Sequence, residues 1–148
     1  MPNSVVVTQG GYFSGNLAAL ANSDDVRYRF FDDGDSLVGE IKVTGLCPLG
    51  NAITSYNIKV EARATRPGLQ ELISVFNYDV NSYTDVASDE AALSDTVLAG
   101  DAPGFASDYV SGVNDTAQAL VNFTPFNDEV PVQDGWLLDV DQIQWTVN

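Results

Sequence analysis

The chain has 148 residues, of which 45% are hydrophobic, 10% aromatic and 18% charged. This length and composition fit one globular domain, residues 1–148, large enough to bury roughly 70% of the surface of its unfolded chain. The chain has no histidine, a single cysteine (Cys47) and a formal net charge of -15. The composition therefore excludes histidine-dependent catalytic triads, imidazole metal sites, an intrachain disulfide and a thiolate zinc cluster.

The negative charge is concentrated in the C-terminal part of the chain. Residues 1–66 contain all six basic residues and seven acidic ones, whereas residues 67–148 contain fourteen acidic residues and no basic one. Nucleic acids and anionic membrane surfaces bind through clustered Lys and Arg, so we expect neither as a partner. No run reaches the about 18 apolar residues of a membrane helix, so we expect no membrane insertion. The Asp-rich, Lys-poor composition favours an extracellular or cell-surface location.

Alternation of polar and apolar residues predicts strands in the first half of the chain. After a short apolar run at residues 5–7, the pattern recurs at residues 26–30, 37–43 and 56–64. In residues 56–64 the odd and even positions separate into a polar and an apolar set. A period of two is typical of a strand with one face in the core and the other in water.

The second half continues the pattern with shorter elements. Residues 69–78 and 83–86 are expected to pair across a turn, and residues 96–98, 117–123 and 136–147 to form further strands. The segment 89–95 fits one helical turn, and 125–135 is expected to be an acidic loop. About eight short strands separated by turns predict an all-β fold, an antiparallel β-sandwich with jelly-roll topology.

Three segments carry a resemblance to a known fold family. They are residues 14–25 before a strand containing Tyr28, residues 73–78 joined through a short turn to 83–86, and residues 136–145 near the C-terminus. In this order they resemble the galactose-binding-domain-like β-sandwiches found as accessory modules of secreted bacterial proteins, a jelly roll shared by many carbohydrate-binding modules. The resemblance implies a non-catalytic extracellular module whose partner is a carbohydrate or the neighbouring domains of a larger secreted protein.

The same resemblance implies a structural calcium ion between the loop after the first strand and the terminal strand. The positions that match are Asp24, Asp25 and Asp141. Calcium takes roughly six to eight oxygen ligands, which clustered carboxylates supply together with backbone carbonyls. The alternative is that Asp24 caps a turn and that Asp141 is simply exposed on its strand.

Carbohydrate binding needs flat aromatic faces beside polar groups that hold sugar hydroxyls. Aromatic residues in alternating strand patterns are expected in the core: Tyr28, Phe30, Tyr56, Phe76, Phe123 and Trp145. Aromatic residues near expected loops are Tyr12, Phe13, Tyr83, Phe105, Tyr109, Phe126 and Trp136. We predict that Tyr109, Trp136, and Phe126 with Asn127 bind the ligand, because each of these rings has an Asp or Asn beside it in a loop. The alternative for each ring is that it caps the edge of the sandwich.

Enzymatic signatures do not accompany these features. The chain has no phosphate-binding glycine loop and no Gly-x-Ser-x-Gly elbow, and no carboxylate lies in an evidently apolar loop that would raise its pKa. We therefore expect a non-catalytic module. Two other roles stay open: a structural domain of a larger secreted protein, and self-assembly into a surface layer whose acidic C-terminal part is bridged by divalent ions.

Overall fold

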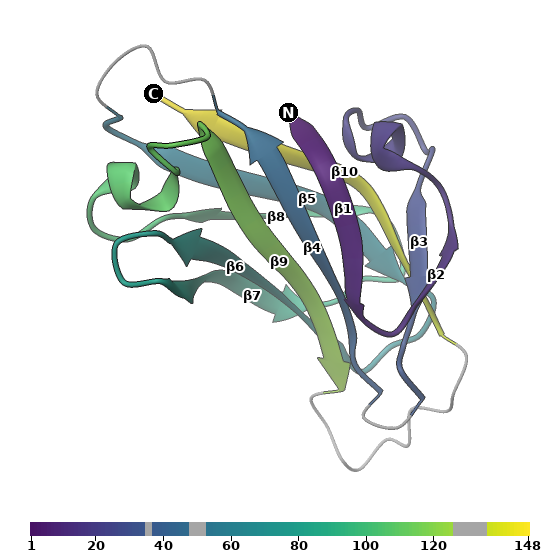
Figure 1. Ribbon diagram of the computed structural model, residues 1–148. Coiled ribbons are helices and arrows are strands. Elements are labelled where there is room, and N and C mark those ends of the chain that lie inside the picture. The colour runs from purple at the N-terminus through teal and green to yellow at the C-terminus, as the bar shows by residue number, and fades with distance from the viewer. Residues whose placement is uncertain (35–36, 48–52, 126–135) are drawn as a thin grey trace.

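A computed structural model describes residues 1–34, 37–47, 53–125 and 136–148, which form two stacked five-stranded antiparallel sheets (Figure 1). The first sheet has the order β1 (Pro2–Gln9), β4 (Gly39–Leu46), β9 (Thr116–Pro125), β6 (Leu69–Asn77) and β7 (Ser82–Glu90). The second has the order β2 (Gly11–Ser14), β3 (Tyr28–Phe31), β10 (Leu137–Val147), β5 (Tyr56–Ala64) and β8 (Thr96–Asp101). The predicted all-β jelly-roll sandwich is confirmed, with ten strands among the described residues in place of about eight.

The period of two in the sequence decides which side chains enter the core. In β5 every second side chain from Tyr56 to Ala64 is buried, and the intervening ones are exposed or half-buried. Strands β4 and β9 alternate in the same way and pair with each other from Gly39 and Phe123 onward. Strand β4 begins two residues later than predicted, because Leu37 takes a positive φ of 57° that regular strand backbone does not adopt.

The core lies between the sheets and is filled by large apolar side chains from both. The bulkiest side chains with no exposed surface are Trp136, Phe30, Phe123, Leu20, Ile41, Ile58, Leu69, Ile73 and Leu138. Phe30 of the second sheet and Phe123 of the first meet edge to face, with ring centroids 6.2 Å apart. Burial of each such side chain contributes about 1.5 to 3 kcal/mol, so this layer dominates the stability of the fold.

The aromatic residues predicted for the core separate into two groups. Four of them are buried: Tyr28, Phe30, Tyr56 and Phe123. Trp145 is half-buried against the core, and its ring lies over Gly45. Phe76 is also half-buried, but it occupies the outward position on β6, so its assignment to the core was wrong.

Some short elements were missed by the sequence analysis. Strand β2 has only four residues, which are too few to show an alternating pattern, and its pairing with β3 contains a register shift. The two described helices, η1 (Leu17–Leu20) and η2 (Ala106–Tyr109), are single 3₁₀ turns, and none in the described ranges is long and apolar enough to cross a membrane. The one helical turn considered for the ambiguous segment 89–95 does not form: β7 runs to Glu90, and the rest is non-helical.

Candidate functional site

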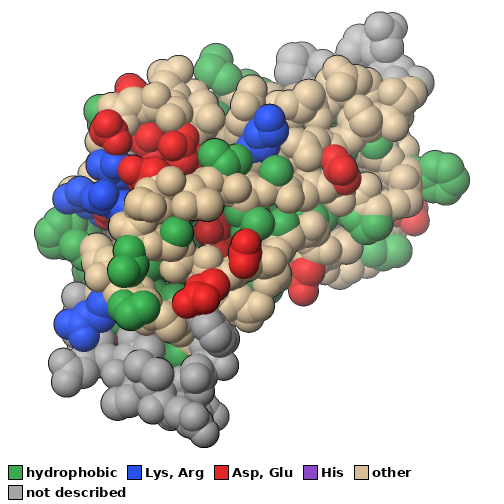
Figure 2. Space-filling view, turned by 180° about the vertical axis from the view of Figure 1, so that it is seen from behind, with side chains coloured by type: hydrophobic (Ala, Val, Ile, Leu, Met, Phe, Trp, Pro, Cys, Tyr) green, Lys and Arg blue, Asp and Glu red, His purple; other side chains and the backbone are tan. Residues whose placement is uncertain are grey.

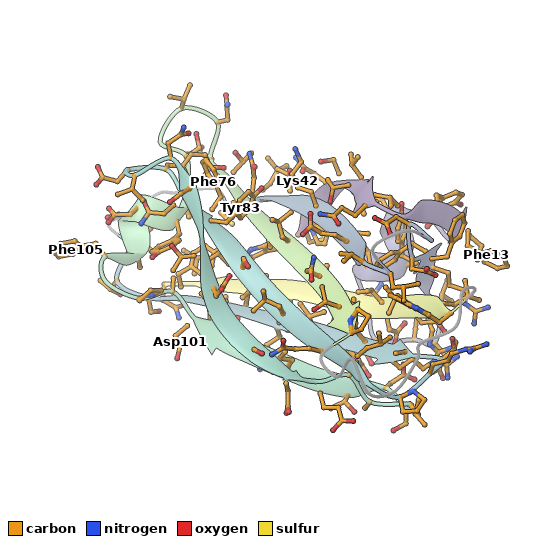
Figure 3. The ribbon with its side chains drawn as sticks, turned by 90° about the horizontal axis from the view of Figure 1, so that it is seen from below. Phe13, Lys42, Phe76, Tyr83, Asp101 and Phe105 are labelled. Atoms are coloured by element: carbon orange, nitrogen blue, oxygen red, sulfur yellow. The ribbon has the colours of Figure 1, made fainter. Side chains whose placement is uncertain are left out.

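The outer face of the first sheet carries a group of aromatic and polar side chains. Side chains alternate between the two faces of a strand. The side chains of β4, β6, β7 and β9 that do not enter the core therefore lie on the solvent side of this sheet. The group comprises Glu40, Lys42, Ser74, Phe76, Tyr83, Asp85, Gln118 and Asn122, and we refer to it as the outer sheet face. Figure 3 shows Phe76, Tyr83 and Lys42 on the same side of the molecule.

Two neighbouring strands supply the aromatic part of the outer sheet face. Phe76 of β6 is the cross-strand partner of Tyr83 of β7, and their rings meet edge to face with centroids 5.0 Å apart. Tyr78 contacts Phe76 in the same manner at 4.9 Å. All three rings are half-buried, so each is held by its neighbours while part of its surface remains open to water.

The hydroxyl of Tyr83 is held in its neutral form. Burial is the main cause that raises the pKa of Tyr83, and electrostatic interactions with Tyr78 and Glu40 raise it further. The protonated hydroxyl donates a hydrogen bond to Gln118 Oε1 at 3.4 Å. This long bond ties the tyrosine to β9 and leaves the amide nitrogen of Gln118 as a donor.

The carboxylates of the outer sheet face are held in fixed orientations by hydrogen bonds. Glu40 accepts one bond from Thr8 Oγ1 at 2.7 Å and another from Asn122 Nδ2 at 2.9 Å. Ser74 Oγ donates to Asp85 Oδ1 at 2.6 Å. Since a carboxylate has about four acceptor positions, both groups retain lone pairs that can accept from a ligand hydroxyl.

Lys42 differs from these paired groups. It lies between Val6 of β1 and Leu120 of β9 in the cross-strand register. Within the part of the chain that the structure describes, its ammonium group makes no hydrogen bond or ion pair. It is therefore a donor for a ligand placed on this face.

The structure places two of the predicted ligand-binding residues, Trp136 and Tyr109, away from the outer sheet face. Trp136 has no exposed surface and Tyr109 is 2% exposed, and both belong to the core. The hydroxyl of Tyr109 donates to the carbonyl of Pro103 at 2.9 Å. Neither ring presents a face to solvent, which agrees with the alternative in which such rings close the sandwich. Phe126 and Asn127 lie outside the described residues.

The sequence did contain a signal that Phe76 lies on the outer sheet face, although the sequence analysis did not select it as a binding residue. Leu69, Ile73 and Val75 are buried and have the same parity along β6, which gives Phe76 the outward position. Its apolar character led to the opposite assignment. Tyr83 was grouped with the loop aromatics and belongs to a strand.

Other exposed aromatic rings are dispersed over the molecule. Phe13 is 55% exposed on the edge strand β2, and Phe105 is 79% exposed beside η2. Figure 3 shows these two side chains at opposite ends of the sandwich. They therefore cannot contact one short ligand together.

The three predicted metal ligands come close to one another but direct their carboxylates to different partners. Asp141 on β10 is 2% exposed, and its Oδ2 accepts from the backbone N–H of Asp25 at 3.3 Å. Asp24 Oδ1 accepts from the N–H of Val26 at 3.1 Å, as expected for a turn cap, and Asp25 Oδ1 lies 2.6 Å from Arg27 Nη2. Burial raises the pKa of Asp141. The alternative in which Asp141 is exposed was therefore wrong.

This donor set does not fit a calcium ion. Calcium requires roughly six to eight converging oxygens, whereas Asp25 is paired with a guanidinium and Asp24 caps its own turn. In the described ranges, no group of three or more His, Cys, Asp or Glu is arranged to hold a metal. We therefore derive no calcium-dependent property for the protein from this arrangement.

Comparison with known proteins identifies the class of fold. No protein-family model matches the sequence, and no curated protein matches it either. The structure, by contrast, is similar to solved carbohydrate-binding modules over nearly the whole chain. The chain thus has the jelly-roll fold of these β-sandwich modules, as the resemblance implied.

Three solved structures illustrate the similarity. TmCBM61 in complex with β-1,4-galactotriose matches with a TM-score of 0.56 and 10% identity, over 98% of this chain and 88% of that one. A lysine-to-alanine variant of CBM29-2 complexed with cellulohexaose matches with a TM-score of 0.52 and 9% identity, over 99% and 82%. The CBM22-1–GH10 modules of Clostridium thermocellum xylanase Xyn10B with xylohexaose match with a TM-score of 0.53 and 11% identity, over 97% of this chain and 24% of that one.

Proposed function

We propose that this protein is a non-catalytic carbohydrate-binding module that binds a glycan chain on its outer sheet face. The observation that carries the proposal is the edge-to-face pair of Phe76 and Tyr83 on an open sheet, with Gln118 and Lys42 on neighbouring strands. Aromatic rings pack against the C–H surfaces of sugars, and amide and ammonium groups donate to sugar hydroxyls. The similar modules were solved with galactotriose, cellulohexaose and xylohexaose, which supports a chain oligosaccharide as the ligand class.

The dimensions of the outer sheet face suit an internal stretch of a glycan. Tyr83 pairs with Phe76, Tyr83 reaches Gln118, and Gln118 pairs with Thr44, which gives a row across β7, β6, β9 and β4. Neighbouring strands are about 4.8 Å apart, so this row is about 14 Å long. An open row of this kind can bind several consecutive sugars without requiring a chain end.

The carboxylate whose pKa best suits general acid catalysis is Glu71, and its position does not support a catalytic role. Burial raises the pKa of Glu71 to about 8, a range in which a carboxylic acid can donate a proton at neutral pH. Glu71, however, is 5% exposed and shares the inward side of β6 with Leu69 and Ile73. It cannot reach a glycan on the opposite side of the sheet.

We further propose that the module acts outside the cell, as part of a larger secreted protein. The acidic, lysine-poor composition supports this location. In the xylanase that the chain resembles, the matched region is about a quarter of a chain that also holds a GH10 module. The neighbouring domains of such a protein would be the second class of partner.

Affinity electrophoresis in gels containing soluble galactan, β-glucan or xylan tests the proposal, with isothermal titration of the matching oligosaccharide for any glycan that retards the protein. We expect at least one glycan to retard the wild type, and Tyr83→Ala to abolish that retardation. Phe105→Ala is the matched control, since its ring is exposed but lies outside the outer sheet face. If a folded wild type is retarded by no glycan, the role as a structural or self-assembling domain replaces this proposal.

A further inference from the structure

The outer side of the second sheet carries two arginines that share one buried carboxylate. Arg29 of β3 and Arg63 of β5 are the cross-strand neighbours of Asp139 on β10, which lies between them. Asp139 alternates with the inward side chains of Leu138 and Val140, yet it is only 1% exposed, because the two arginines in contact with it shield it from water. Figure 2 shows the face that includes the second sheet, with basic and hydrophobic side chains gathered at one end of it.

The two arginines contact Asp139 in different ways. Arg63 Nε donates to Asp139 Oδ2 at 3.0 Å, and Arg63 Nη2 lies 2.9 Å from the same oxygen. Arg29 Nε lies 3.1 Å from Oδ1, but this contact lacks hydrogen-bond geometry, and Oδ1 has no hydrogen-bond partner among the described residues. The guanidinium of Arg29 has five N–H donors and makes no hydrogen bond in the part of the chain that the structure describes, and 36% of its side chain is exposed.

These three groups leave one positive charge on this side of the sheet. Arg29 and Arg63 contribute two positive charges, and Asp139 offsets one of them. Arg63 also interacts electrostatically with Asp95, but that carboxylate accepts hydrogen bonds from both Nε and Nη2 of Arg27. An anion beside Arg29 therefore meets a guanidinium with free donors, the group that binds carboxylates through paired N–H groups.

An exposed aromatic ring lies on the same side of β3 as this guanidinium. Phe31 follows Arg29 by two residues, so both side chains leave the same face of the strand, about 7 Å apart along it. The ring of Phe31 lies over Gly11 of β2, its cross-strand partner, where an added Cβ would overlap the ring atoms. The backbone of β2 thus supports the ring, while 39% of Phe31 remains exposed. A ring supported in this way offers its outer surface to the C–H groups of a sugar.

We propose that Phe31, Arg29 and Arg63 form a second glycan site, which binds a uronic acid residue. The ring of Phe31 packs against the sugar, and the free N–H groups of Arg29, assisted by the charge of Arg63, bind its carboxylate. That a sugar carries this carboxylate rests on the proposed function, although the site lies on the opposite sheet from the outer sheet face. Because the whole protein has a net charge of -15, it repels polyanions, so the ligand that fits is a largely neutral glycan with isolated uronic acid residues.

NMR titration with methyl β-D-glucuronide and methyl β-D-glucoside tests this proposal, since the two sugars differ only in the carboxylate at C6. We expect the wild type to bind the glucuronide about tenfold more tightly than the glucoside. Arg29→Gln should lose this preference and still fold, because Arg63 continues to bind Asp139. Lys59→Gln is the matched control: it removes a positive charge from the same side of the sheet, about 13 Å along β5 from Arg63, and should keep the preference.

A second variant tests the aromatic part of the site. Phe31→Leu keeps an apolar cover over Gly11 but has no flat ring, so it should bind the glucuronide about three- to tenfold more weakly. The proposal is overturned if the wild type binds the glucuronide no more tightly than the glucoside or acetate, or if folded Arg29→Gln or Phe31→Leu keeps the wild-type affinity. Loss of the preference in Lys59→Gln would overturn it as well, because the affinity would then reflect net charge. Affinity electrophoresis in neutral glycans reports separately on the outer sheet face, so failure of that site does not alter this result.

Discussion

The hydroxyl of Tyr83 on β7 reaches Gln118 on β9, although β6 lies between these two strands in the sheet. The tyrosine side chain therefore extends across the sheet instead of projecting from it. Phe76 of β6 packs its ring against the ring of Tyr83 and holds it in that direction. An aromatic ring laid along an open sheet is a suitable platform for the flat side of a sugar.

Tyr83→Ala should therefore weaken glycan binding by roughly ten- to a hundredfold, since a well-placed aromatic anchor contributes about 1.4 to 3 kcal/mol. Isothermal titration with the oligosaccharide identified by affinity electrophoresis measures the change. Tyr83→Phe is the control: it keeps the ring, loses only the long bond to Gln118, and should retain most of the affinity. Wild-type affinity in a folded Tyr83→Ala would place the binding site elsewhere.

Lys42→Ala should reduce affinity by about three- to tenfold, because it removes a hydrogen-bond donor worth about 0.5 to 1.5 kcal/mol. Its melting temperature should stay close to that of the wild type, since Lys42 makes no hydrogen bond or ion pair within the described ranges. Lys59→Ala is the matched control, an exposed lysine on β5 of the other sheet. If both variants lose the same affinity, the effect reflects net charge and not contact with the ligand.

The fold could be predicted from the sequence because burial imposes a period of two on each strand. Residues 56–64 show this directly: the predicted wet and dry positions are those of β5. The site was harder to predict, since alternation does not show which strands become neighbours. Phe76 and Tyr83 acquire their joint role only through the pairing of β6 with β7.

Local polarity was a poor guide to exposure for two predicted ligand residues. Trp136 follows an acidic stretch of the sequence, yet its ring has no exposed surface, because a large apolar side chain gains more from core packing than from a polar neighbourhood. Tyr109 is buried for the same reason and satisfies its hydroxyl on the carbonyl of Pro103. Such competition depends on the space left between the sheets, which a single sequence does not reveal.

For the predicted metal ligands, the sequence again indicated which residues lie near one another but not which partners their carboxylates bind. The resemblance brought Asp24, Asp25 and Asp141 together, and the fold places the first two beside the third. The ion pair of Asp25 was not predictable, because it depends on Arg27, whose guanidinium also binds Asp95 just before β8. In the sequence Arg27 was only one of two arginines on the wet side of a strand.

Gly100→Ala should destabilise the protein by about 1 to 3 kcal/mol. Gly100 of β8 faces β7 so closely that an added Cβ would lie 2.5 Å from the carbonyl oxygen of Val86, and backbone cannot move aside as a side chain can. Thermal unfolding measures the loss, with Gly112→Ala as the control because nothing lies within 4 Å of its Cβ position. Equal melting temperatures for the two variants would show that the edges of the two sheets are not in this close contact.

Glu71→Gln should stabilise the protein by an amount that increases with pH. Glu71 is 5% exposed, and burial, with a smaller contribution from the charge of Asp89, raises its pKa from 4.5 to about 8. Between these values the folded state of the wild type holds a proton that the unfolded state has released, so its free energy of unfolding decreases as pH rises through this window. The glutamine variant does not titrate, so its advantage should be small near about pH 4.5 and reach a few kcal/mol at about pH 8. Urea unfolding of both proteins across this range measures the difference, and a difference independent of pH would contradict a buried, unpaired carboxyl at this position.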